Sequence, residues 1–121
     1  MQKINDNFKG KSIISIEQFS LDDIASLFKE VDKVKAQVQK GEALDDLRGR
    51  VVANLFYEAS TRTSSSFSAA AQYLGGGVVA INDVHYSSVS KGENLADTVR
   101  TLEQYTDAIV LRHPEKGAVK L

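Results

Sequence analysis

The sequence predicts an α/β fold in which a parallel sheet carries helices on both faces, as three layers. Three short apolar runs have the length and composition of strands that are buried on both sides. Amphipathic segments alternate with these runs, and such an alternation is typical of a parallel sheet with right-handed crossovers. The 121 residues are enough for one domain, so we expect one domain over residues 1–121.

The composition is ordinary for a soluble globular protein, with 42% hydrophobic and 26% charged residues. Fifteen basic and sixteen acidic residues leave no basic surplus, so we expect no nucleic acid partner. No apolar run is long enough to cross a bilayer and the start of the chain lacks a signal-peptide pattern, so we expect a cytoplasmic protein without a membrane partner. The absence of cysteine excludes a thiolate nucleophile, and two histidines do not favour a metal site.

The first helix has the strongest signals in the chain. The polar residues 1–11 predict a loose lead-in before it. Ser20 is suited to cap the helix, and two aspartates follow in the first turn, where the helix dipole favours negative charge. Lys40-Gly41 predicts its end. Its apolar stripe consists of Leu21, Ile24, Leu27, Phe28, Val31, Val34 and Val38.

The three strands and two further helices follow from the remaining apolar residues. Strands are expected at residues 51–57, 78–81 and 108–111. The second helix is marked by Phe67, Ala70, Ala71 and Leu74 before the glycines at 75–77, and the third by Leu95, Val99, Leu102 and Tyr105. Ligands of parallel sheets bind beyond the carboxyl ends of the strands, so the loops 57–62, 82–92 and 112–114 are candidate site positions.

The junction from Glu58 to Thr63 has the features of an anion site. It follows a buried strand and opens a helix, whose unpaired N–H groups and dipole favour a negative charge. Hydroxyl groups of Ser60, Thr61 and Thr63 add donors, and the planar guanidinium of Arg62 is suited to phosphate. From spacing alone, a plain Ser/Thr helix cap beside a surface arginine explains these residues equally well.

Two other loops place polar residues at the same end of the predicted sheet. Ser87, Ser88 and Lys91 lie in the first loop, which taken alone indicates an ordinary polar loop. Arg112 and His113 directly follow the third strand and taken alone indicate a strand end with an exposed arginine. The convergence of three such loops favours a shared binding site.

The chain resembles the carbamoyltransferases at these positions. Residues 56–63, followed by Ser66-Phe67, are similar to the carbamoyl-phosphate-binding signature of that family. Residues 91–98 and 107–114 resemble aspartate carbamoyltransferase in particular, and the similarity runs from about residue 10 to the end. Ornithine carbamoyltransferases share the Ser-Thr-Arg-Thr element, so ornithine remains the alternative acceptor.

The resemblance implies a substrate and the residues that hold it. Ser60, Thr61, Arg62 and Thr63 would bind the phosphate of carbamoyl phosphate. Thr63 and Arg112 would lie near its carbamoyl end. Arg62, Thr63 and Arg112 are therefore the residues expected to carry catalysis.

The resemblance also implies that the site is shared between subunits of a homotrimer. Ser88 and Lys91 match a loop that reaches into the site of a neighbouring subunit, although Ser87 competes with Ser88 for that match. Glu58 matches a position that helps to bridge to the second domain when the domains close. His113 would lie in the surroundings of the carbamoyl group.

The implied reaction is transfer of the carbamoyl group to the amino group of L-aspartate in de novo pyrimidine biosynthesis. It gives N-carbamoyl-L-aspartate and phosphate, and it requires no cofactor. Catalysis would come from positioning two substrates and from cations aimed at developing negative charge. The resemblance implies that the carbamoyl-phosphate domain is truncated and the aspartate-binding domain absent, so we expect the chain alone to be inactive. A non-catalytic anion-binding or subunit-interaction module is the alternative from another class.

Overall fold

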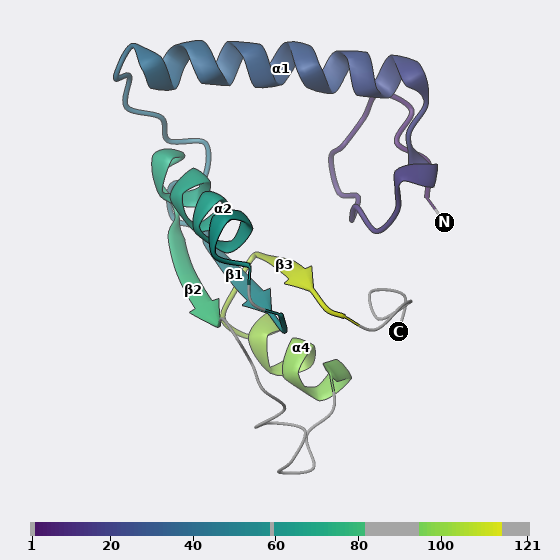
Figure 1. The fold of residues 1–121 in the computed structure, drawn as a ribbon, viewed down its shortest axis with the longest axis vertical. Coiled ribbons are helices and arrows are strands. Elements are labelled where there is room, and N and C mark those ends of the chain that lie inside the picture. Colours follow the sequence, from purple (N-terminus) through teal and green to yellow (C-terminus); the bar gives the residue numbers. More distant parts are fainter. Residues whose placement is uncertain (1, 59, 82–94, 115–121) are drawn as a thin grey trace. The chain divides into compact units, whose positions relative to one another are not determined.

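The computed structural model describes residues 2–58, 60–81 and 95–114 (Figure 1). The chain divides into two compact units, Met1–Glu42 and Ala43–Leu121. The first contains the short helix η1 (Ile16–Gln18) and α1 (Leu21–Gln39). The second contains β1 (Val51–Phe56), α2 (Thr61–Tyr73), β2 (Gly77–Ile81), α4 (Leu95–Glu103) and β3 (Ala108–Arg112). No helix in the described ranges is long and apolar enough to cross a membrane.

The second unit is built on a parallel sheet in the order β2-β1-β3 (Figure 1). The two faces of its central strand β1 pack differently. Ala53, Leu55 and the following Tyr57 form a buried cluster with Leu102 of α4. Asn54 instead donates hydrogen bonds to two serines of α2. Successive side chains point to opposite faces of a strand, so α2 and α4 cover opposite faces and the predicted fold class is confirmed.

The side chains by which α2 meets the sheet are the predicted ones only in part. Phe67 was expected to be in the apolar face, yet it is 45% exposed, whereas Ser64 and Ala71 are buried. Small side chains allow the helix backbone to lie close to β1, where Asn54 donates to the Ser64 carbonyl oxygen and to the Ser68 hydroxyl. Tyr105 was expected to mark the third helix, but it lies beyond Glu103 and is also exposed.

Helix α2 ends at the glycines, as predicted. The Gly75 and Gly76 N–H groups donate to the carbonyl oxygens of Gln72 and Ala71 at 3.0 and 2.9 Å. Gly75 has a φ of +84°, which a residue with a Cβ rarely adopts. This motif turns the chain from α2 directly into β2.

In the first unit, α1 begins and ends as predicted. The Oγ of Ser20 accepts a hydrogen bond from the Asp23 N–H, and the Asp23 carboxylate accepts one from the Ser20 N–H. The predicted loose lead-in is wrong, because Ile4 is fully buried and its N–H donates to the Gln18 carbonyl oxygen at 2.9 Å. The isolated apolar residues of this polar segment gave no periodic signal, although Ile4 and Phe8 help to hold it against residues 18 and 19.

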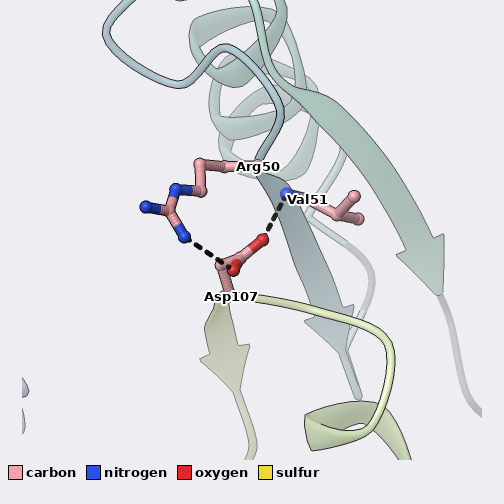
Figure 2. Close-up of polar contacts among 3 residues, drawn as sticks. All are labelled: Arg50, Val51 and Asp107. Atoms are coloured by element: carbon pink, nitrogen blue, oxygen red, sulfur yellow. Dashed lines mark hydrogen bonds and ion pairs between the residues drawn. The ribbon is translucent and has the colours of Figure 1, made fainter.

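The amino ends of β1 and β3 are held together by Asp107 (Figure 2). Its carboxylate accepts hydrogen bonds from the Val51 N–H at 2.9 Å and from the Arg50 guanidinium at 3.3 Å. The Asp107 N–H in turn donates to the Val51 carbonyl oxygen at 2.8 Å. These contacts pin the register of the two strands at the end of the sheet opposite to the candidate loops.

We expect the Asp107 contacts to make stability depend on pH in the acid range. The Val51 N–H, followed by the Arg50 guanidinium, lowers the pKa of the Asp107 carboxyl below its ordinary value. The ionised Asp107 carboxylate therefore makes its full contribution to the free energy of unfolding above about pH 4. That contribution is lost as the pH falls through the lowered pKa that this carboxyl has in the folded chain. Urea unfolding should show Asp107→Asn less stable than wild type at pH 6, with a difference that shrinks as the pH falls below about 4. Asp46→Asn, at an exposed aspartate, is the control. A difference that does not change with pH would contradict this account.

Candidate functional site

The carboxyl ends of β1 and β3 bring three of the expected site residues together. The parallel register pairs Phe56 with Arg112, which places Arg112 on the face of the sheet that α2 covers. The Arg112 Nη1 donates to the Ser60 Oγ at 3.2 Å, and its Nε lies 3.5 Å from the Glu58 Oε1. A guanidinium is therefore held at the start of α2, between the helix cap and a carboxylate.

The start of α2 has features that suit an anion. Ser60 has an extended φ of −152°, and its carbonyl oxygen accepts the first helical hydrogen bond from the Ser64 N–H at 2.9 Å. Its hydroxyl does not cap the helix but accepts from Arg112, so the plain cap explanation fails for this residue. The first turn contains no acidic residue. Backbone N–H groups and a nearby guanidinium together favour a phosphate-like ligand here.

Thr61, Arg62 and Thr63 form the first turn of α2. Thr61 and Arg62 are exposed, and Thr63 is half-buried. Within the described ranges, the Arg62 guanidinium makes no ion pair with a carboxylate, so its positive charge is not neutralised by such a contact. The turn thus presents a charged fork and two hydroxyls beside Ser60.

His113 lies on the other face of the sheet from Arg112. Its ring packs against Tyr57, with ring centroids 4.7 Å apart and an angle of 55° between the planes. Consecutive residues of an extended segment point to opposite faces, so the geometry that brings Arg112 to Ser60 directs His113 toward the α4 side. The structure therefore does not bring His113 to the anion site.

The loop residues Ser87, Ser88 and Lys91 lie outside the described residues, so their predicted part in the site is not located.

One residue close to the site was missed in the sequence. Asn54 is 1% exposed and lies beneath the first turns of α2, where its Nδ2 donates to the Ser64 carbonyl oxygen at 2.8 Å and to the Ser68 Oγ at 2.9 Å. The available signal was a single amide in the middle of an apolar strand run. Asparagine is disfavoured in strands, so its presence there calls for a polar partner on the covering helix.

Residues 11–121 match the family described as aspartate/ornithine carbamoyltransferase, carbamoyl-P binding domain. The chain belongs to this family. The matched range includes all the strands of the second unit and the whole Glu58–Arg112 site.

Among its relatives within the carbamoyltransferases, the chain is 49% identical over 113 residues to the aspartate carbamoyltransferase catalytic subunit of Thermoplasma acidophilum. That match covers 93% of this chain and 37% of the relative. The Multifunctional protein CAD of Squalus acanthias is 49% identical over 114 residues, which are 94% of this chain and 5% of that protein. The chain therefore spans little more than a third of the catalytic subunit.

A solved carbamoyltransferase structure has the same fold. Aspartate transcarbamoylase from Trypanosoma cruzi, in complex with carbamoyl phosphate and aspartate, superposes with a TM-score of 0.86 at 48% identity. The match covers 95% of this chain and 36% of that one. The three-layer arrangement around β1 is thus shared with an enzyme whose structure holds both substrates.

Proposed function

We propose that this chain is the carbamoyl-phosphate-binding part of an aspartate carbamoyltransferase. The observation that carries the proposal is the Arg112–Ser60 contact at the start of α2, in a chain that belongs to the carbamoyltransferase family. The relatives named aspartate carbamoyltransferase favour aspartate over ornithine as the acceptor. The product would be N-carbamoyl-L-aspartate, an early intermediate of pyrimidine biosynthesis.

In this proposal, the first turn of α2 binds the phosphate of carbamoyl phosphate, and Arg112 acts where the carbamoyl group joins that phosphate. The N–H groups and hydroxyls of residues 60–63 and the Arg62 guanidinium hold the phosphate. Arg112 lies beside Ser60, where it stabilises negative charge on the carbonyl oxygen and the leaving phosphate. The aspartate amine attacks the carbonyl carbon, the C–N bond forms, the bond to the phosphate oxygen breaks and the amine loses a proton. No covalent enzyme intermediate is needed.

The acceptor half of the site and the residues from a neighbouring subunit would come from outside the described structure. We propose that Ser88 and Lys91 extend to the site of an adjacent subunit in a homotrimer, and that Glu58 bridges to an acceptor domain on closure. A cytoplasmic enzyme of nucleotide precursor synthesis fits this assignment. A non-catalytic anion-binding module is the competing function, and it is favoured only if a complete enzyme built around this chain is inactive.

Activity is tested with a chimera in which residues 11–121 replace the matching segment of the Thermoplasma acidophilum subunit. We expect the chimera to form N-carbamoyl-L-aspartate from carbamoyl phosphate and aspartate, because the 49% identity spans nearly the whole replaced segment. We expect the 121-residue chain alone to show no turnover, because it provides only the carbamoyl-phosphate half. A folded chimera without activity, beside an active unaltered subunit, would favour the non-catalytic module.

A smaller effect is expected at Glu58, because its carboxylate competes with a bound anion for Arg112. Both side chains of this ion pair are nearly half exposed, and pairs of that kind contribute about 0.2–1 kcal/mol. Glu58→Gln should therefore tighten inorganic phosphate binding to the chain by up to about fivefold in calorimetric titrations at low salt. Glu103→Gln removes the same charge from the exposed end of α4 and should change little. Weaker phosphate binding by Glu58→Gln would contradict the competition.

A further inference from the structure

We propose that Asn54 is a positioning residue for the anion site, acting through the first two turns of α2. The inference rests on the proposed function, since it concerns how the carbamoyl-phosphate turn is held in place. In the described part of the chain, Asn54 makes no hydrogen bond to residues 60–63. It binds the helix that begins at the site, at Ser64 and Ser68.

The contacts of Asn54 are aimed at the helix backbone as well as a side chain. Its Nδ2 donates to the Ser64 carbonyl oxygen at 2.8 Å and to the Ser68 Oγ at 2.9 Å. A carbonyl oxygen can only accept, so the contact with Ser64 fixes which end of the amide faces the helix. Both hydrogens of the amide group are thereby used. The two hydrogen bonds hold α2 at a fixed distance from β1 and limit its rotation about its own axis.

A short polar path leads from Asn54 to the site. The carbonyl oxygen of Ser64 accepts from Asn54, and the N–H of the same residue donates to the Ser60 carbonyl oxygen at 2.9 Å. The Ser60 hydroxyl then accepts from Arg112 at 3.2 Å. A shift of α2 along or around its axis would move the Ser60–Thr63 turn relative to Arg112, which is fixed on a different strand.

Stability alone does not explain why an asparagine occupies position 54. The side chain is 1% exposed, and its buried Oδ1 has no hydrogen-bond partner among the residues that the structure describes. A buried acceptor without a partner carries an unrecovered desolvation cost, which the two hydrogen bonds from Nδ2 offset only in part. The neighbouring strand positions opposite Asn54 are Ala80 and Val110, both apolar. An amide here is therefore better explained by what it fixes than by the free energy of burial.

The test compares Asn54→Leu, Ser68→Ala and the control Ser65→Ala, which removes an exposed hydroxyl from the same helix. In the 121-residue chain, hydrogen exchange of the Ser64 amide and the dissociation constant for inorganic phosphate are measured by NMR. Asn54→Leu should keep the fold and the exchange rates of α4. In this variant, the Ser64 amide hydrogen should exchange about tenfold faster, and the dissociation constant for phosphate should rise about tenfold. Ser68→Ala should change both quantities in the same direction but by less.

The measurements decide whether Asn54 holds the anion-binding turn in place. A folded Asn54→Leu variant with wild-type Ser64 exchange and wild-type phosphate affinity would overturn it. If Asn54→Leu does not fold, Ser68→Ala takes its place, and values equal to those of Ser65→Ala would overturn the inference. If the wild-type chain binds no phosphate, the proposed function fails, while the exchange rate of the Ser64 amide still decides whether Asn54 holds the turn.

Discussion

Arg112→Ala, in the active chimera that carries residues 11–121, is expected to lower kcat/KM for carbamoyl phosphate by about 10²–10³. The reason is that this guanidinium is held beside Ser60 at the start of α2, where the proposed function places the developing negative charge of the reaction. Removing a donor that is already oriented for that charge loses stabilisation that water cannot replace. Steady-state kinetics with carbamoyl phosphate varied at saturating aspartate provide the measurement.

Two controls separate the loss of Arg112 from the exposure of its partner. Arg100→Ala removes an exposed arginine that pairs with Asp97 on α4, and it should leave kcat/KM nearly unchanged. Arg112→Ala also leaves the Glu58 carboxylate without its cation, which by itself would repel a phosphate. The double variant Glu58→Gln/Arg112→Ala should therefore remain within about fivefold of the single variant. Full recovery in the double variant would show that repulsion, and not lost catalysis, explains the defect.

Arg62→Ala is expected to reduce kcat/KM of the chimera by a similar factor of about 10²–10³, with almost no effect on stability. Arg62 is exposed, and in the described part of the chain its side chain contacts no carboxylate. The thermal unfolding midpoint of the Arg62→Ala chimera should therefore lie within about 3 °C of that of the unaltered chimera. The measurement pairs kinetics with a thermal unfolding curve on the same preparation.

Arg62→Lys is the matched variant, because it keeps the charge but replaces the planar fork by a single ammonium group. We expect it to recover only part of the activity, since a lysine does not bind a phosphate in the bidentate manner of arginine. Near-normal turnover in Arg62→Ala would remove this residue from the phosphate site. Equal turnover in Arg62→Lys and wild type would show that charge alone is required.

Most of the fold was predictable from the sequence, and so was the end of the sheet at which the candidate residues meet. The apolar runs around Leu55, Ala80 and Val110 indicated buried strands, and their alternation with helices required a parallel sheet. The rule that ligands lie beyond carboxyl strand ends then selected the residues after Phe56 and Arg112. The fold prediction succeeds because it depends on local periodicity and on a general property of parallel sheets, whereas the assignment of the site residues stays a prediction.

The contacts within the site depend on information that periodicity does not contain. Arg112 meets Glu58 and Ser60 because β3 pairs with β1 in one particular register, which only the folded sheet defines. The alternation of side chains was available, however, and it already implies that Arg112 and His113 face opposite sides. Asn54 was missed for a related reason, since its partners lie 10 and 14 residues later on α2.

The face of α2 also shows where an apolar pattern misleads. Phe67 and Ala71 both fitted a helical stripe, but only Ala71 is buried. The helix approaches β1 through Ser64 and Ser68, whose polar atoms bind Asn54. A packing surface of small polar residues is recognised only once its partner is known.

The central claim is that the Ser60–Thr63 turn and Arg112 bind carbamoyl phosphate, and it is tested most directly by titrating the labelled chain with that substrate. The backbone amide spectrum is followed by NMR, with inorganic phosphate in a parallel titration. Our account predicts saturable shifts concentrated at the amides of residues 60–64 and at Arg112. It also predicts a weakening of these shifts in Arg62→Ala. Absence of binding, or saturable shifts confined to residues outside this turn and Arg112, would contradict the account.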